Sequence, residues 1–183
     1  MFPLSDSIKA VRFPLLNLLI IAANIFVFYL QLTTPDPEGF IRQYALIPAQ
    51  VNFLNFATLI PFITAMFLHG GFMHIISNMW FLKVFGDNVE GHMNPLLFLL
   101  LYFGSGIVGN VLQYMLMSSS SIPILGASGA VAGILVAYFI LFPHSKVKTF
   151  VPIFFFFTVV SILAILILGV WFIPQIFSVV SSL

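Results

Sequence analysis

Apolar residues run along this chain in long stretches, and the few charged residues fall between them. The uncharged intervals cover residues 13–35, 43–82, 91–145 and 149–183. A helix that crosses the hydrocarbon core of a bilayer needs about 20 apolar residues. The intervals therefore predict about five transmembrane helices.

Breaks within the intervals place the individual spans. An "HGG" sequence at residues 69–71 separates a loop or surface segment from the second span, and "SSSSIP" at residues 118–123 separates the third span from the fourth. No repeat or linker divides the chain, so residues 1–183 are expected to form a single all-α domain, a bundle of transmembrane helices. We expect the five spans near residues 13–31, 74–86, 95–117, 127–142 and 149–171.

Composition supports a membrane protein, and charge orients it. Hydrophobic residues make up 61% of the chain and charged residues 6%, against about 25% charged residues in soluble proteins. Lys and Arg gather on the cytoplasmic side of membrane proteins. With a cytoplasmic N-terminus, only Arg42 of the 6 Lys and Arg residues lies outside. A net charge of +1 gives no sign of nucleic-acid binding.

Three polar residues fall at a similar depth near the outer surface. His74 opens the second span and Asn78 follows one turn later, so both side chains lie on one face of that helix. Ser128 lies in the first turn of the fourth span, shortly after Pro123, and that span descends from the same side. Polar groups inside a bilayer are costly, so each is a functional candidate.

These three residue types suit acyl transfer. Such a reaction needs a nucleophilic hydroxyl and hydrogen-bond donors directed at the oxyanion of the tetrahedral intermediate. Ser128 offers the hydroxyl, while His74, Asn78 and the Ser128 backbone N–H offer donors. Gly129 and Gly133 form a GxxxG spacing, which allows a partner helix, and a base carried on it, to approach closely.

Each of these signals has a structural alternative. A serine in a membrane helix usually bonds to the carbonyl of residue i−4, and a GxxxG pair by itself indicates helix packing. An isolated His or Asn serves as an interhelical hydrogen-bond partner about as often as it serves as a catalytic group. Asn110 and Gln113 are interpreted as such partners on the third span. Asp87 and Glu90 are interpreted as a solvated or ion-paired helix end.

Other hydrolytic chemistries fit the sequence less well. Zinc proteases carry H-E-x-x-H, whereas "HIISN" at residues 74–78 has neither the glutamate nor the second histidine. His69 and His74 have no neighbouring carboxylate, so we expect no metal site and no cofactor. An intramembrane aspartyl protease needs two aspartates within the membrane that share a proton, and only Asp87 lies near a span.

Two stretches carry these features together. "MFLHGGFMHIISNMWFLKVFGDNVE" at residues 66–90 holds an H-x-x-x-N pair, and "GASGAVAG" at residues 126–133 holds a G-x-S-G serine on a later span. This combination resembles the rhomboid family of intramembrane serine proteases. "FPLLNLLIIAANIFVF", "YALIP" and "VPIFFFF" also look like prokaryotic members, so the similarity covers nearly the whole chain and implies a prokaryotic plasma membrane.

The resemblance implies an endopeptidase that cleaves transmembrane segments of membrane proteins near their outer end. Ser128 is then the nucleophile, and His74 and Asn78 belong to the oxyanion hole. His69 matches a family histidine with a structural role, and Glu90 matches an acidic residue at the inner end of the second span. The implied partners are transmembrane protein substrates and the lipid bilayer.

The chain departs from the family at two points. The first loop, residues 32–68, lacks the Trp-Arg pair that many members carry. The family's catalytic base is a histidine on a sixth span, whereas this chain holds five of the expected six. His92 and His144 fall at cytoplasmic helix ends, on the wrong side for Ser128. We therefore expect the chain to be truncated at its C-terminus and inactive as it stands.

Two other functional classes compete with the protease. A non-catalytic rhomboid-like protein would bind or escort membrane proteins and would not need the base. A small transporter would show inverted repeats and broken helices in both halves. The sequence has no such paired halves, so the transporter fits least well.

Overall fold

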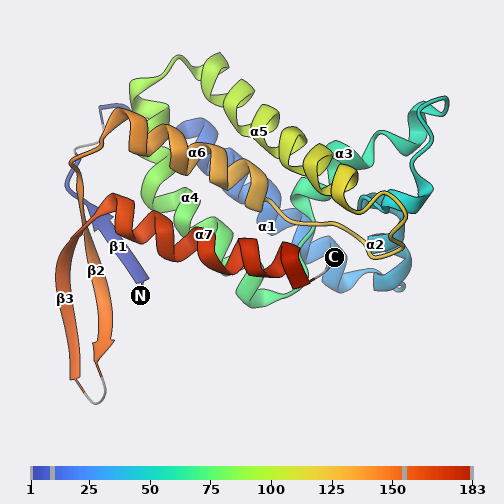
Figure 1. Ribbon diagram of the computed structural model, residues 1–183. Helices are drawn as coiled ribbons and strands as arrows, with labels where there is room; N and C mark the ends of the chain where they lie inside the picture. The colour runs from blue at the N-terminus through green and yellow to red at the C-terminus, as the bar shows by residue number, and fades with distance from the viewer. Residues whose placement is uncertain (1, 9–10, 154–155, 182–183) are drawn as a thin grey trace.

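The structure is a computed structural model that describes residues 2–8, 11–153 and 156–181. A bundle of helices forms most of it, and a small antiparallel sheet extends from one end (Figure 1). The elements are β1 (Phe2–Asp6), α1 (Leu15–Thr33), α2 (Pro37–Tyr44), η1 (Pro48–Gln50), η2 (Phe56–Thr58), α3 (Pro61–Thr64), η3 (Ala65–Phe67), α4 (Phe72–His92), α5 (Pro95–Leu116), α6 (Ser128–Leu141), β2 (Lys146–Ile153), β3 (Phe156–Leu163) and α7 (Ala164–Ser181).

Helices α4 and α6 lie side by side and run in the same direction. Phe85 of α4 packs edge-on against Tyr138 of α6 with ring centroids 4.9 Å apart, and His92 packs on Phe142 at 4.8 Å near the helix ends. Helix α1 packs against α4, and α5 packs against α6 (Figure 1). The first turns of α4 and α6 therefore lie at the same end of the bundle.

The start of α1 is capped by a residue from another helix. The first backbone N–H groups of a helix have no acceptor within it, and an apolar medium supplies none. Glu90, near the end of α4, accepts hydrogen bonds from the N–H groups of Leu16 at 3.0 Å and Asn17 at 2.7 Å. The predicted solvated or ion-paired helix end is therefore wrong for Glu90, which is buried. Asp87 is half-buried and accepts from the N–H of Asn88.

Helices occupy the first four predicted spans. Helices α1 and α5 are each long and apolar enough to cross a membrane. The segment Phe56–Phe67 and α4 pass the same test as one span, bent by 78° at the break between them. Helix α6 and the apolar part of α7, Ala164–Ile173, are shorter. Among the described residues, length and composition thus support two or three spans, and five spans stay a prediction.

The prediction of a helix over residues 149–171 is wrong in its first half. Strands β2 and β3 pair there as an antiparallel hairpin, β1 joins the other edge of β2, and α7 begins only at Ala164. The segment is rich in β-branched and aromatic residues, which favour strands, and Pro152 disfavours a helix interior. The fold is therefore a helical bundle with a three-stranded sheet rather than all-α.

Candidate active site

Ser128 is the first residue of α6, and the turn before it is held in place from both sides. Ile124 exchanges backbone hydrogen bonds of 2.8 and 3.0 Å with Leu46, and the N–H of Gly126 donates to the carbonyl of Ala65 at 2.9 Å. Ser128 itself is half-buried. Its backbone N–H belongs to the first turn of the helix, where no intrahelical acceptor exists.

His74 lies in the first turn of α4, with its ring against Gly126. A Cβ atom at Gly126 would lie 2.7 Å from His74 Nε2 and 2.6 Å from Cε1, so only glycine leaves room for the ring. Gly126 also has a φ of +122°, a region that residues with a Cβ rarely adopt. The structure thus brings His74 to a position two residues before Ser128.

A backbone donor sets the tautomer of His74. The N–H of Gly70 donates to His74 Nδ1 at 3.3 Å, so Nδ1 is an acceptor and the proton of the neutral imidazole lies on Nε2. The ring edge that faces Gly126 therefore carries an N–H group. This geometry directs an N–H group of His74 at Gly126, close to the start of α6.

Asn78 lies one turn after His74 on the same helix and is 1% exposed. Its Nδ2 donates to the backbone carbonyl of His74 at 3.0 Å, and its Oδ1 has no hydrogen-bond partner among the described residues. The second N–H of the amide stays available as a donor. Among the same residues, no hydrogen bond joins Ser128 to His74 or Asn78.

The GxxxG pair after the serine packs against α5. A Cβ at Gly129 would lie 3.5 Å from the Cα of Gly109 and 3.6 Å from the Cα of Gly106, while one at Gly133 would lie 2.2 Å from Ser105 Oγ. The predicted close approach of a partner helix is therefore confirmed. Helix α5 contains no histidine, so this partner does not supply the histidine base that the spacing would allow.

Comparison with known proteins places the chain in a family. The Rhomboid domain family matches residues 57–182, more than half of the chain. This protein belongs to the rhomboid family. Rhomboid proteins are in general intramembrane serine proteases that act on membrane protein substrates within the bilayer. No solved structure gave a significant match.

Several rhomboid proteins are similar to this one. Rhomboid protein 1, mitochondrial, of Saccharomyces cerevisiae is 34% identical over 136 residues, which cover 72% of this chain and 38% of the yeast protein. The presenilin-associated rhomboid-like protein, mitochondrial, of Homo sapiens is 28% identical over 140 residues, which cover 75% of this chain and 36% of the human protein. The rhomboid protein YdcA of Bacillus subtilis is 37% identical over 76 residues, 42% of this chain and 38% of that protein.

These relatives bear on length and location. The matched segments span little more than a third of the length of the yeast and human proteins. They support an integral membrane protein, as do its apolar helices. Since the first two are mitochondrial by name, they do not support the predicted prokaryotic plasma membrane.

The remaining histidines of this rhomboid domain lie away from Ser128 or are enclosed. His92 ends α4, about 27 Å along the helix from His74 at 1.5 Å per residue, and His144 follows the far end of α6. His69 is fully buried with its ring 5.1 Å from that of His74, and its ring nitrogens have no hydrogen-bond partner among the described residues. His69 therefore packs beside His74 without facing solvent.

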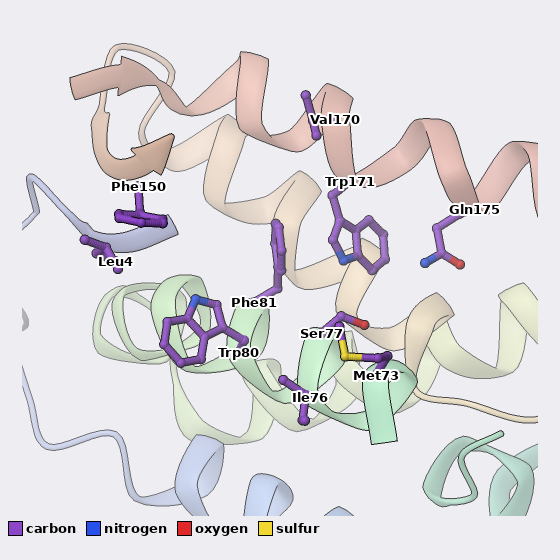
Figure 2. A pocket seen from close by; sticks show the side chains of 10 residues that line it. All are labelled: Leu4, Met73, Ile76, Ser77, Trp80, Phe81, Phe150, Val170, Trp171 and Gln175. Carbon is purple, nitrogen blue, oxygen red and sulfur yellow. The ribbon is translucent and has the colours of Figure 1, made fainter. Parts of the chain in front are cut away.

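A pocket of about 450 Å³ lies between α4 and α7, and residues of β1 and β2 also line it (Figure 2). Met73 and Ser77, which flank His74 on α4, line it, and Gln175 projects into it from α7. The Ser77 hydroxyl donates to the carbonyl of His74 at 2.9 Å. Most of the wall is apolar: Leu4, Ile76, Trp80, Phe81, Phe150, Val170 and Trp171.

Sequence reasoning missed a row of buried amides on α1. Asn17, Asn24 and Gln31 are spaced by seven residues, a spacing that places them on one face of the helix. Asn17 donates to the carbonyl of Leu82, and Asn24 donates to the hydroxyl of Tyr102. The regular spacing of amides inside an apolar helix is the signal that could have found them.

Asn110 is a polar link of the predicted kind with an unexpected partner. Its Nδ2 donates to the carbonyl of Phe62 at 2.9 Å, in the short helix α3. The amide therefore fastens the segment before α4 to α5, on the side of the bundle where Ser128 begins α6.

Proposed function

We propose that this rhomboid protein is an intramembrane serine endopeptidase that cleaves transmembrane segments of other membrane proteins near their outer end. One observation carries the proposal. The Nε2 edge of His74 lies against Gly126, two residues before Ser128, at the shared end of two parallel helices. A hydroxyl, an imidazole N–H and an orphan backbone N–H thereby share one neighbourhood.

In the proposed mechanism Ser128 is the nucleophile. Its Oγ forms a bond to the scissile carbonyl carbon, and the negative charge that develops on the carbonyl oxygen is stabilised by the N–H groups of His74 Nε2, Asn78 Nδ2 and the Ser128 backbone. Collapse of this intermediate breaks the C–N bond, and the base returns the proton taken from Ser128 to the departing amine. The amine half of the substrate leaves, and an ester remains on Ser128. Water then hydrolyses the ester, which restores the hydroxyl.

The Ser128 hydroxyl must give up its proton to a base. We propose that this base comes from outside these 183 residues. His74 is committed as a donor by the N–H of Gly70, and His69 is enclosed. Loss of the base in a serine and histidine pair leaves only a small residual activity. The 183-residue chain by itself is therefore expected to be inactive.

The pocket beside α4 is the proposed entry for the substrate. It is apolar enough to accept side chains of a transmembrane segment, and it adjoins the turn of α4 that carries His74. A helical peptide bond is shielded by its own hydrogen bonds and side chains. The segment must therefore unwind before Ser128 can attack it.

We propose a membrane orientation with the N-terminus on the side that collects most Lys and Arg residues. Ser128 and His74 then lie toward the opposite, outer face, because α4 and α6 begin there. Cysteine scanning with a membrane-impermeant reagent tests this orientation. Labelling of the loop at residues 118–121 from the N-terminal side would contradict it.

A non-catalytic rhomboid that binds or escorts membrane proteins is the second candidate. The observation that favours it is the absence of a suitable base around Ser128 among the described residues of this chain. Such a protein would keep the bundle and the apolar pocket and would bind a transmembrane segment without cleaving it.

A fluorophosphonate probe separates the two candidates. We expect the protein expressed from its full reading frame in lipid vesicles to label at the serine, and Ser128→Ala to abolish the label. The 183-residue chain is expected to label far more slowly and to leave a model transmembrane substrate intact. A folded full-length protein that never labels would contradict the protease proposal. Ser128-dependent cleavage by the 183-residue chain would show that the chain contains a base.

A further inference from the structure

A side-chain amide on α1 holds the backbone of the loop before α4. Gln31 Nε2 donates to the carbonyl of His69 at 2.8 Å, and the N–H of His69 donates to Gln31 Oε1 at 3.2 Å. Gln31 is 6% exposed and His69 is fully buried. The Gln31 amide thus forms hydrogen bonds with both the N–H and the carbonyl of His69. His69 belongs to no helix and is buried, so neither helix nor water supplies these partners.

The same loop touches His74 through the next residue. The N–H of Gly70 donates to His74 Nδ1, which leaves the Nε2 proton facing Gly126. The peptide that carries this N–H joins Gly70 to His69, the residue that Gln31 holds. Any rotation of that peptide would weaken the bond to Nδ1.

We propose that Gln31 is a positioning residue for His74. It fixes the peptide between His69 and Gly70 and thereby keeps the imidazole in the Nε2–H tautomer, with that N–H directed toward the start of α6. This role rests on the proposed function of His74 as an oxyanion donor. Gln31 touches no reacting atom and acts through two intervening residues.

A second contact from α1 supports the arrangement. Phe28, one turn before Gln31, packs edge-on against the His69 ring at 6.3 Å and against Phe72 at 5.3 Å. The His69 ring in turn lies edge-on to that of His74. Helix α1 therefore fixes residue 69 by its backbone through Gln31 and by its ring through Phe28.

Nitrogen NMR of histidine reads the tautomer without any need for activity. We would prepare the 183-residue chain with ¹⁵N-labelled histidine in lipid nanodiscs, at about pH 8 where imidazole is neutral. His74→Gln assigns the signals of His74 by their loss. A backbone hydrogen bond of ordinary strength favours one tautomer about fivefold, so we expect Nδ1 to appear as the unprotonated nitrogen in the wild type.

Gln31→Met is the test variant, because it keeps a similar volume and removes both hydrogen bonds. We expect the preference for Nε2–H to weaken in it, toward that of a neutral histidine without this hydrogen bond. Asn24→Leu is the matched control, a buried amide on the same helix that bonds to Tyr102 and to the carbonyl of Ile20 rather than to the loop. This control should keep the tautomer of His74 even if it unfolds at a lower temperature.

A third variant keeps the proposal testable if Gln31→Met does not fold. Gln31→Glu keeps an acceptor for the N–H of His69 and loses the donor to its carbonyl, so we expect a weaker preference than in the wild type. An unchanged His74 spectrum in the folded Gln31 variants would contradict the positioning role of Gln31. An equal change in Asn24→Leu would contradict it as well, because Gln31 would then have only a structural role.

Failures of the two proposals are distinguishable. A full-length protein that never labels at Ser128 counts against the protease and leaves the tautomer result standing. An unchanged tautomer counts against the positioning role alone. In an active protein, Gln31→Met is expected to lower kcat by about 100-fold, as a misplaced catalytic group does, with little change in KM.

Discussion

At the scale of single residues, the small side chains around Ser128 have separate tasks. Gly126 makes room for the His74 ring and adopts a backbone conformation that suits glycine. Gly129 and Gly133 make room for α5. The sequence shows one run of small residues, yet one part of it serves the site and the other serves helix packing.

Gly126→Ala tests the first of these tasks. We expect it to lower the free energy of unfolding by about 1–3 kcal/mol because alanine is strained at this φ, and to displace the His74 ring. Thermal unfolding in detergent micelles measures the first effect and histidine NMR the second. Gly104→Ala is the control, since a Cβ there meets no other atom within 4 Å. Equal stability of the two variants would contradict the assignment.

At the scale of elements, helices are joined by polar groups that reach from one to another. Glu90 of α4 caps α1, Asn110 of α5 holds α3, and Gln31 of α1 holds the loop before α4. Membrane helices gain little from hydrophobic contact with one another, because lipid is equally apolar. Such polar contacts therefore fix the placement of helices together with close packing at small residues.

Glu90→Ala is expected to destabilise the protein by about 3 kcal/mol, since hydrogen bonds to charged groups contribute about 1.5–3 kcal/mol. The loss should appear first as faster hydrogen exchange at the start of α1. Glu38→Ala, on the exposed surface of α2, is the control and should change stability by less than about 0.5 kcal/mol. Unaltered exchange at Leu16 and Asn17 in the Glu90 variant would speak against the cap.

Gly133→Ala tests the contact between α5 and α6. Its Cβ would lie 2.2 Å from Ser105 Oγ, so the helices must separate or Ser105 must turn. Overpacking of this kind costs about 1–3 kcal/mol. Gly169→Ala is the matched control, because a Cβ on Gly169 of α7 meets nothing within 4 Å. Unfolding midpoints of both variants in micelles measure the difference. A Gly133→Ala variant as stable as the wild type would show that α5 and α6 can accommodate the added methyl group.

At the scale of the whole molecule, the two ends of the bundle are held differently. Ser128 and His74 lie at one end, beside loops fixed by backbone bonds. At the other end, Asp6 of β1 accepts hydrogen bonds from Asn88 of α4 at 2.8 Å and from Tyr138 of α6 at 2.6 Å. The N-terminal strand thereby ties the two central helices together far from the site.

Burial raises the pKa of Asp6 above 3.8, although its hydrogen bonds act in the opposite direction. The folded state therefore binds the proton more tightly than the unfolded state. This contribution to stability is fully present below the unfolded pKa and is lost as pH rises through the folded pKa.

We accordingly expect the stability of the wild type relative to Asp6→Asn to fall as pH rises from below 3.8 and then to level off. Unfolding midpoints of both proteins across an acidic pH series measure this. A difference that does not change with pH would mean that burial and the hydrogen bonds cancel.

The sequence by itself determined the membrane class, the helices around the site and the family. Long uncharged runs predicted α1, α4, α5 and α6. His74 and Ser128 lie in the first turns of α4 and α6, and Asn78 lies one turn after His74, as predicted. These features depend on local composition and on spacing within one helix, which a sequence displays directly.

Only the tertiary structure decided which helix faces which. Apolar residues cover most of every face of a membrane helix, so no hydrophobic stripe indicates its neighbour. The partner of the GxxxG pair, the cap of α1 by Glu90 and the link from Gln31 to His74 all join residues distant in sequence. The hairpin of β2 and β3 was missed for a related reason, because a continuous apolar run does not distinguish a strand from a helix.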